Sequence, residues 1–210
     1  KVSVIPIGLD KRTYPLVIPE RLDYWRERFG EKFFLFVGVI RYYKGLHILI
    51  EAARNSDYPI IIVGAGQIEN SLKEQAKKLG VNNIHFVGRI SDSEKVVLLE
   101  LSYAVIFPSH LRSEAFGISL LEGAMYGKPL ISSEIGTGTT YINIDGETGV
   151  VVPPSNSIAL RQAMDYLWNN PVIAKEMGMR AEARYWDLFT ADKMAKSYAD
   201  LYNSVLQSAK

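Results

Sequence analysis

The chain has 210 residues, 48% of them hydrophobic, and is therefore long enough to bury the core of one large domain or two small ones. Its 24 basic and 23 acidic residues leave a net charge of +1, which gives no electrostatic reason to expect a nucleic-acid-binding protein. The absence of cysteine excludes disulfides and thiolate metal sites, and no apolar run reaches the roughly 18 residues of a membrane span. The chain starts abruptly at KVSVIPIGLD without the features of a signal peptide, so we expect a fragment of a longer protein.

Apolar runs of strand length alternate with helical patterns along most of the chain. VSVIPI at 2–7 alternates like a short strand, and Pro19 predicts the start of a helix that Gly30 ends. Further strands are predicted at 33–39, 59–64, 84–88, 103–109, 128–133 and 149–155, with helical segments between them that include 44–54 and 67–80. Strands that are apolar on both faces and alternate with helices predict an α/β fold with a doubly wound, Rossmann-like parallel sheet.

The last part of the chain, from about 155 to 210, has helical patterns only. We therefore predict a ligand-binding domain over 1–185 and a C-terminal helix over 186–210. That helix carries an apolar and aromatic stripe on one face, a pattern that belongs to a protein core more often than to a ligand site. The stripe consists of Met194, Tyr198, Leu201, Tyr202 and Val205.

Ligands of open parallel sheets bind beyond the carboxyl ends of the strands, so the loops that follow the strands are the place for a site. Small residues such as Gly38 and Gly66 in these loops let backbone amides approach a ligand. Arg41 and Lys44 lie between a strand and a helix, where they could converge on one dianionic group. Two solvated loop cations are the alternative interpretation.

The segment SEAFGISLLEGAMYGKP at 113–129 raises a specific question. Ile118, Leu121, Glu122 and Met125 have the spacing of a buried helical stripe, and a carboxylate on such a face is costly unless it is paired. One answer is a capping box in which Ser119 is the N-cap of the helix and Glu122 its partner. The other answer is that the stripe borders a cleft and that Glu122 binds a ligand.

Two common kinds of site are disfavoured. GAGQIE at 64–69 fails the dinucleotide fingerprint because Glu69 replaces the third small residue and no acidic group follows the next strand near Arg89. The three histidines are dispersed and the chain has no Asp-x-Asp pair, so no metal site is expected. A phosphate group would have to be neutralised by arginine, lysine and backbone amides. Glu114, just before a helix, could simply favour the helix dipole.

The ordered motifs nevertheless resemble one family over about residues 4–202. The motifs are FVG, a basic loop ending in KG, VGAG, FVGRI, FPS, two glutamates separated by seven residues (EAFGISLLE), GKPLISSEIG and DGETGVVVPP. This order is similar to the nucleotide-sugar-binding half of retaining family-four glycosyltransferases with the GT-B fold, in particular bacterial polysaccharide mannosyl- and hexosyltransferases. The resemblance favours the ligand interpretation of Glu122 over the capping box.

The resemblance implies a role for each matching residue. Glu122 would receive the ribose hydroxyls, so that the ligand pairs its carboxylate, and Glu114 would face the transferring sugar and steady positive charge at the anomeric carbon. Arg41 and Lys44 would clamp the diphosphate leaving group. The remaining substrate contacts would come from the amides of Phe116, Gly117 and Ile118, from the backbone around Arg89 and Ile90, and from the glycine loops.

The implied activity is transfer of a hexose from GDP-mannose or a UDP-sugar to a glycan or lipid-linked acceptor, with retention and without cofactor or metal. The acceptor would bind to an N-terminal domain that is absent here, against which the terminal helix would pack. The chain alone would then bind donor weakly and transfer little. A cytoplasmic location is expected, at the inner membrane face if the full-length protein is a peripheral membrane protein.

Two departures from the family pattern bear on the site. Val39 stands where most relatives have an arginine, and the cation comes two positions later at Arg41, which an extended backbone would place on the same face. GTGTT at 136–140 replaces a loop that often contains Gly-Gly, which marks a subgroup with a different sugar preference. The alternatives to a transferase are a non-catalytic nucleotide-diphosphate-binding module and, more weakly, an NAD-dependent oxidoreductase.

Overall fold

A six-stranded parallel sheet forms the middle layer of the protein in a computed structural model, which describes residues 2–208. Its strands lie in the order β3-β2-β1-β4-β5-β6, so the chain winds outward from β1 in one direction and then from β4 in the other. The strands are β1 (Phe34–Val37), β2 (Ile60–Val63), β3 (Ile84–Gly88), β4 (Ala104–Phe107), β5 (Leu130–Ser133) and β6 (Gly149–Val152). The predicted doubly wound α/β fold is confirmed.

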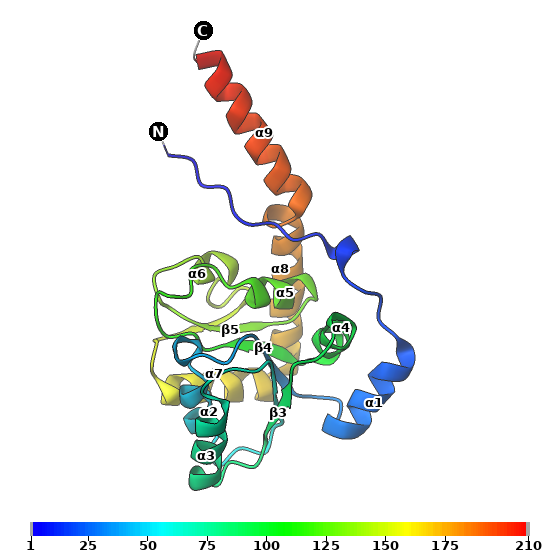
Figure 1. Ribbon diagram of the computed structural model, residues 1–210, viewed down its shortest axis with the longest axis vertical. Helices are drawn as coiled ribbons and strands as arrows, with labels where there is room; N and C mark the ends of the chain where they lie inside the picture. Colours follow the sequence, from blue (N-terminus) through cyan, green and yellow to red (C-terminus); the bar gives the residue numbers. More distant parts are fainter. Residues whose placement is uncertain (1, 209–210) are drawn as a thin grey trace.

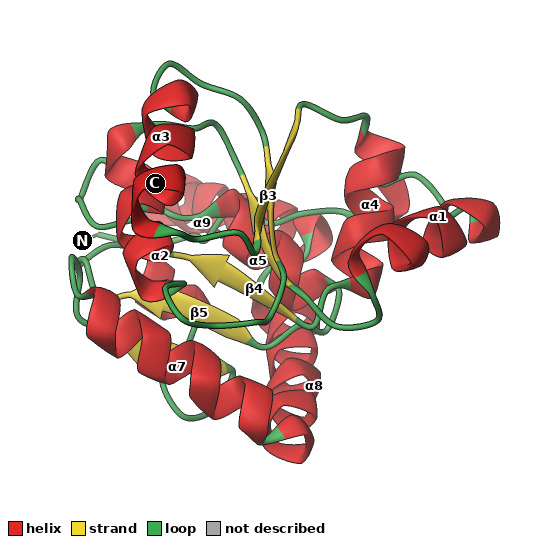
Figure 2. Cartoon of the chain, turned by 90° about the horizontal axis from the view of Figure 1, so that it is seen from below, coloured by secondary structure: helices red, strands yellow, loops and turns green. Residues whose placement is uncertain are grey.

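Helices cover both faces of this sheet, as Figures 1 and 2 show. They are α1 (Pro19–Phe29), α2 (Leu46–Ala52), α3 (Glu69–Leu79), α4 (Asp92–Leu101), α5 (Ile118–Met125), α6 (Thr139–Ile142), α7 (Ser157–Asn169), α8 (Pro171–Leu188) and α9 (Ala191–Ser208). Short 3-10 turns occur at Lys11–Thr13 and Tyr42–Lys44. No helix among the described residues is long and apolar enough to span a bilayer.

The strand residues divide between two hydrophobic cores because successive side chains of a strand point to opposite faces. Phe34 and Phe36 of β1 pack with α2, α3 and α7 on one face, whereas Leu35 packs with α1, α4 and α5 on the other. All three side chains are completely buried, and full burial of one such side chain stabilises the fold by about 1.5–3 kcal/mol. Residues of α8 contribute to both cores, so this helix runs across one end of the sheet.

The first described residues do not form the strand predicted at 2–7. Val2 and Val4 are 94% and 87% exposed, and no strand lies beside them to complete a hydrogen-bonded ladder. The chain is tied to the C-terminal helices at Gly8, whose amide donates to the sulfur of Met194 at 3.3 Å, and at Leu9, whose amide donates to the Phe189 carbonyl at 2.9 Å and whose carbonyl accepts from the Tyr185 hydroxyl at 3.0 Å. From there the N-terminal segment and α9 run away from the sheet in the same direction (Figure 1).

The C-terminal helix also differs from the prediction. Helix α8 continues to Leu188 and α9 starts at Ala191, so the boundary between helices lies beyond the predicted division at 185/186. None of the residues described in α9 is buried, and Tyr202 is 63% exposed. The stripe is therefore not core within this chain, and its exposure is the one expected of a helix that packs on another domain. Helices 19–29 and 69–79, by contrast, end at Gly30 and Gly80 as predicted.

Candidate functional site

The loops that follow β1, β2 and β4 meet backbone to backbone at the carboxyl end of the sheet. The Ile40 amide donates to the Ala65 carbonyl at 3.0 Å, and a Cβ on Gly66 would lie 1.9 Å from the Ile40 carbonyl oxygen. A Cβ on Gly45 would lie 2.0 Å from the Pro108 carbonyl oxygen. Only glycine fits such contacts, so these loop glycines have a packing role whether or not their amides also bind a ligand.

Lys44 and Glu114 form an ion pair at this meeting point, although 70 residues separate them in the chain. Lys44 ends the short turn after β1, and Glu114 lies in the loop after β4. Their side chains are only 11% and 12% exposed, and the Ser109 hydroxyl donates to Oε2 of Glu114 at 3.3 Å. The sequence-predicted cation and carboxylate are therefore brought together, and a bound anion would share Lys44 with Glu114.

Arg41 precedes this turn and is solvent-exposed. The backbone of Arg41 is extended, with φ −131° and ψ 157°, as is required if Arg41 and Val39 are to lie on the same face of the chain. Val39 is 51% exposed. Arg41 forms no ion pair with any residue in the described range 2–208. Its guanidinium is consequently available to a ligand, and its contact with phosphate remains a prediction.

Helix α5 begins without a capping box. Gly117, in the left-handed region with φ 99°, is the N-cap, and no side chain accepts a hydrogen bond there. Ser119 therefore lies inside the helix, so that the capping-box interpretation is wrong. Ile118 is 42% exposed rather than part of a buried stripe. Because the first amides of a helix have no intrahelical partner, the start of α5 presents N–H donors to an anion.

The GTGTT loop lies against the start of α5. The Gly138 amide donates to the Ala115 carbonyl at 3.0 Å, and a Cβ on Gly138 would come within 2.7 Å of the Phe116 ring. This departure from the family pattern therefore supports the residues next to Glu114, from which sugar contacts are predicted.

Glu122 has partners within the protein, which the sequence analysis did not foresee. Only 5% of the residue is exposed, and its Oε1 accepts hydrogen bonds from the Lys95 ammonium at 2.9 Å and from the Tyr14 hydroxyl at 3.0 Å. Lys95 belongs to α4. Tyr14 belongs to the N-terminal segment, the stretch 2–18 that precedes α1. The expectation that the ligand alone pairs this carboxylate is therefore wrong.

The pKa values of both partners reflect this arrangement. Burial raises the pKa of the Tyr14 hydroxyl, and the charge and hydrogen bond of Glu122 raise it further. Burial by itself would lower the pKa of Lys95, but its contacts with Glu122 and Asp92 outweigh that effect and raise it. At neutral pH the protonated tyrosine and the charged lysine both donate to Glu122, whose negative charge is thereby compensated.

The loop predicted to contact the base follows β3. Arg89 is exposed, whereas Ile90 is half-buried and packs against the core on the α4 side. A cavity of about 270 Å³ lies next to the Glu122 network, between the N-terminal segment and the start of α4. Tyr14 and Lys95 are among its lining residues.

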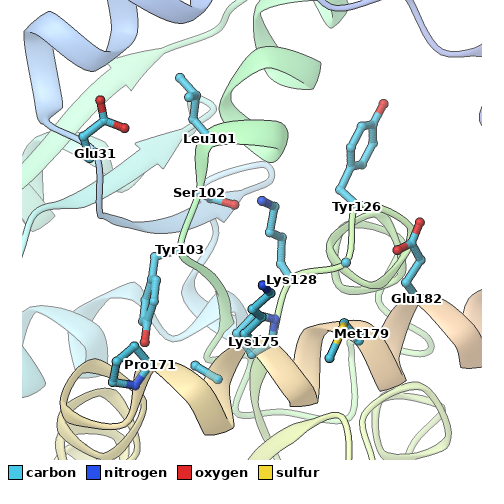
Figure 3. A pocket seen from close by; sticks show the side chains of 13 residues that line it. Glu31, Leu101, Ser102, Tyr103, Tyr126, Lys128, Pro171, Lys175, Met179 and Glu182 are labelled. Carbon is cyan, nitrogen blue, oxygen red and sulfur yellow. The ribbon is translucent and has the colours of Figure 1, made fainter.

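A different cavity, of about 390 Å³, lies at the opposite end of the sheet, where β4 and β5 begin (Figure 3). Lys128 and Lys175 lie between Tyr103 and Tyr126 there, and burial lowers the pKa of Lys128. The Lys128 ammonium donates to the Glu100 carbonyl at 2.6 Å. None of the sequence-predicted site residues lines this cavity, so we do not assign the site to it.

His110 connects three loops of the site, and the sequence analysis did not assign it a role. Its Nε2 lies 3.1 Å from the Tyr42 carbonyl, which can only accept, so Nε2 carries the proton. Its Nδ1 lies 3.1 Å from the Ser155 hydroxyl, which then donates. His110 thus links the basic turn to the turn after β6. No group of three or more metal-ligating side chains was found among residues 2–208.

The comparisons with known proteins agree with this geometry. Residues 22–184 match the family described as "Glycosyl transferases group 1". The chain belongs to this family. It is 65% identical over 191 residues to the D-rhamnosyltransferase WbpZ of Pseudomonas aeruginosa, covering 91% of this chain and 50% of that protein. It is also 48% identical over 208 residues to the O-antigen chain mannosyltransferase C of Escherichia coli, covering 99% of this chain and 56% of that protein.

The fold is similarly that of solved glycosyltransferases. The crystal structure of Anabaena Alr3699/HepE in complex with UDP superposes with a TM-score of 0.85 at 22% identity, over 96% of this chain and 57% of that one. The chain thus spans about half the length of the relatives and structures that it matches. The predicted family, together with the GT-B type of fold, is confirmed.

Proposed function

We propose that this chain is the donor-binding half of a retaining glycosyltransferase that moves a hexose from a nucleotide diphosphate sugar to a glycan or lipid-linked acceptor. The observation that carries the proposal is the convergence of Lys44, Glu114 and the start of α5 at the carboxyl end of the sheet, in a chain of this family. The acceptor would bind to the part of the relatives that this chain does not match.

The chemistry of these groups suits departure of a nucleoside diphosphate. As the glycosidic bond breaks, negative charge grows on the diphosphate, where Lys44, Arg41 and the amides at the start of α5 would stabilise it. We propose that these groups neutralise the leaving group without a bound metal ion. Positive charge grows at the anomeric carbon, next to which Glu114 would lie. Since Glu114 is paired with Lys44 beforehand, the donor phosphate would share the Lys44 ammonium with Glu114.

The names of the relatives suggest the configuration of the donor sugar. One transfers D-rhamnose and the other mannose, and D-rhamnose is the 6-deoxy form of mannose. We infer a manno-configured sugar, carried on GDP or UDP, and synthesis of a bacterial surface polysaccharide as the setting.

Isothermal titration of the chain with GDP and with UDP, in the presence of EDTA, tests the donor site. We expect one of them to bind, and we expect Glu122→Ala to weaken that binding by about 1–3 kcal/mol because a charged hydrogen-bond acceptor is lost. The exposed Glu147→Ala is the matched control, and its affinity should equal that of the parent chain.

Four results would contradict the proposal. If neither nucleotide binds, or if both variants bind as the parent does, the residues at the carboxyl end of the sheet do not form a donor site. If NADH binds instead and quenches the tryptophan fluorescence, the oxidoreductase reading is favoured. A full-length protein that binds the nucleotide but neither consumes donor sugar nor modifies an acceptor extract would be a nucleotide-diphosphate-binding module.

A further inference from the structure

We propose that Tyr14 is a positioning residue, which orients the Glu122 carboxylate for the ribose of the donor nucleotide. The proposal rests on the proposed function, since it takes Glu122 as the group that receives the ribose hydroxyls. It adds a residue of the N-terminal segment, 108 residues from Glu122 in the chain, to the determinants of nucleotide recognition.

The hydrogen-bond pattern at Glu122 is asymmetric. Both donors within the protein, the Tyr14 hydroxyl and the Lys95 ammonium, bind to Oε1 at 3.0 and 2.9 Å. Each carboxylate oxygen can accept two hydrogen bonds, so Oε1 is fully occupied by these two donors. Oε2 receives no hydrogen bond from the residues that the structure describes. This oxygen is therefore the one available to ribose hydroxyls.

The two donors act differently on the carboxylate. Lys95 places a positive charge beside the carboxylate of Glu122, a residue that is only 5% exposed, but the Lys95 ammonium can rotate and its stem is flexible. Tyr14 has a rigid ring and a single proton to donate. It therefore fixes the plane of the carboxylate more closely than Lys95 does, and a carboxylate fixed before binding loses less conformational entropy when the ribose arrives.

Tyr14 is itself held in place from the side of α5. Its ring packs edge-on against Tyr126, with ring centroids 6.4 Å apart, at the end of the helix that bears Glu122. Three residues earlier, the Lys11 ammonium donates to the Met125 carbonyl at 3.0 Å and lies 4.9 Å from the centroid of the Tyr126 ring. The N-terminal segment is thus attached to α5 at two points, and the Tyr14 hydroxyl has little freedom to leave Glu122.

A merely structural role for Tyr14 makes a different prediction from a positioning role. If Tyr14 only supports the fold, its loss affects all nucleotides equally. If it orients Glu122 for ribose, its loss affects a nucleotide that has ribose hydroxyls and spares one that lacks them. The readout is therefore the ratio of the dissociation constants of a ribonucleoside diphosphate and its 2′,3′-dideoxy form.

The experiment titrates the chain and its variants with GDP or UDP, whichever binds, and with the 2′,3′-dideoxy form of the same nucleotide. We expect the parent chain to bind the ribose form more tightly than the dideoxy form. Tyr14→Phe should lower the affinity for the ribose form about tenfold, the value of one charge-assisted hydrogen bond, and should change the affinity for the dideoxy form by less than about twofold. Tyr126→Phe removes a hydroxyl from the neighbouring ring and should change neither affinity by more than about twofold.

Glu122→Gln separates the two ways in which the idea can fail. If this variant keeps the parent's preference for ribose, Glu122 does not receive the ribose, and the proposed donor geometry fails together with the role of Tyr14. If Glu122→Gln abolishes the preference while Tyr14→Phe retains it, or weakens both nucleotides equally, the donor geometry stands and the positioning role is refuted.

Discussion

Replacing Lys44 and Glu114 one at a time and then together tests whether the two side chains stabilise each other as an ion pair or act independently. Both side chains are about nine-tenths buried, so removal of one leaves the other charged in a poorly solvated place. Loss of one partner of a buried pair costs about 3–5 kcal/mol, and the residual exposure places the expected value near the lower end, at about 3 kcal/mol. We therefore expect Lys44→Met alone and Glu114→Leu alone each to destabilise the fold by about this amount.

The double variant should recover much of that stability. Replacement of both charged groups by apolar ones of similar size leaves no unpaired charge, and such exchanges are often neutral. We expect Lys44→Met with Glu114→Leu to lie within about 1.5 kcal/mol of the parent chain in the free energy of unfolding. Nucleotide binding, in contrast, should stay lost, because the cation that meets the diphosphate is absent in the double variant.

Urea unfolding of the four proteins, together with titration of each by the nucleotide that binds, gives both quantities. Lys73→Met is the matched control, because Lys73 is exposed in its ion pair with the half-buried Glu69, and we expect it to change stability by less than about 1 kcal/mol. Additive losses in the double variant would refute the reasoning, since they would mean that the two groups do not interact. Recovery of nucleotide binding in the double variant would refute the assignment of Lys44 to the phosphate.

Two further predictions concern stability around the site. Gly66→Ala places a Cβ 1.9 Å from the Ile40 carbonyl oxygen, so one of the two loops must move. We expect the free energy of unfolding in urea to fall by about 1–3 kcal/mol and nucleotide binding to weaken. If neither the unfolding free energy nor the affinity changes, the loops are not closely packed. Burial lowers the pKa of His47 below its ordinary value of 6.5, and His110 lowers it further. The unfolded chain therefore binds a proton that the folded chain does not, and stability should fall as the pH drops below about 6.5. His47→Gln should make the unfolding free energy less dependent on pH between about 7 and 5.5, and an unchanged dependence would contradict this assignment.

The fold class and most of its elements follow from the sequence alone. Continuous apolar strands need cover on both faces, which a doubly wound parallel sheet with helices on both sides provides. Helix ends that depend on local chemistry were equally predictable. Gly80 ends α3 in the left-handed conformation, and Ser91, which begins a Ser-x-x-Glu pattern in the sequence, caps α4 by accepting from the Glu94 amide. The glycine and basic loops lie together at the carboxyl end of the sheet, as their places after the strands predicted.

Tertiary structure alone decided how the charged groups are paired. The partners of Glu122 are Lys95 and Tyr14, which belong to other elements, and no local pattern could connect them to it. The capping box at Ser119 failed for a different, local reason: Gly117 adopted the left-handed conformation, so the helix began two residues earlier than the Ser119 signal indicated. The segment at 2–7 has a strand pattern but no neighbouring strand, and the stripe of α9 lies away from both cores. A local sequence pattern specifies which face of a helix or strand is apolar, whereas the contacts of that face depend on how the whole chain packs.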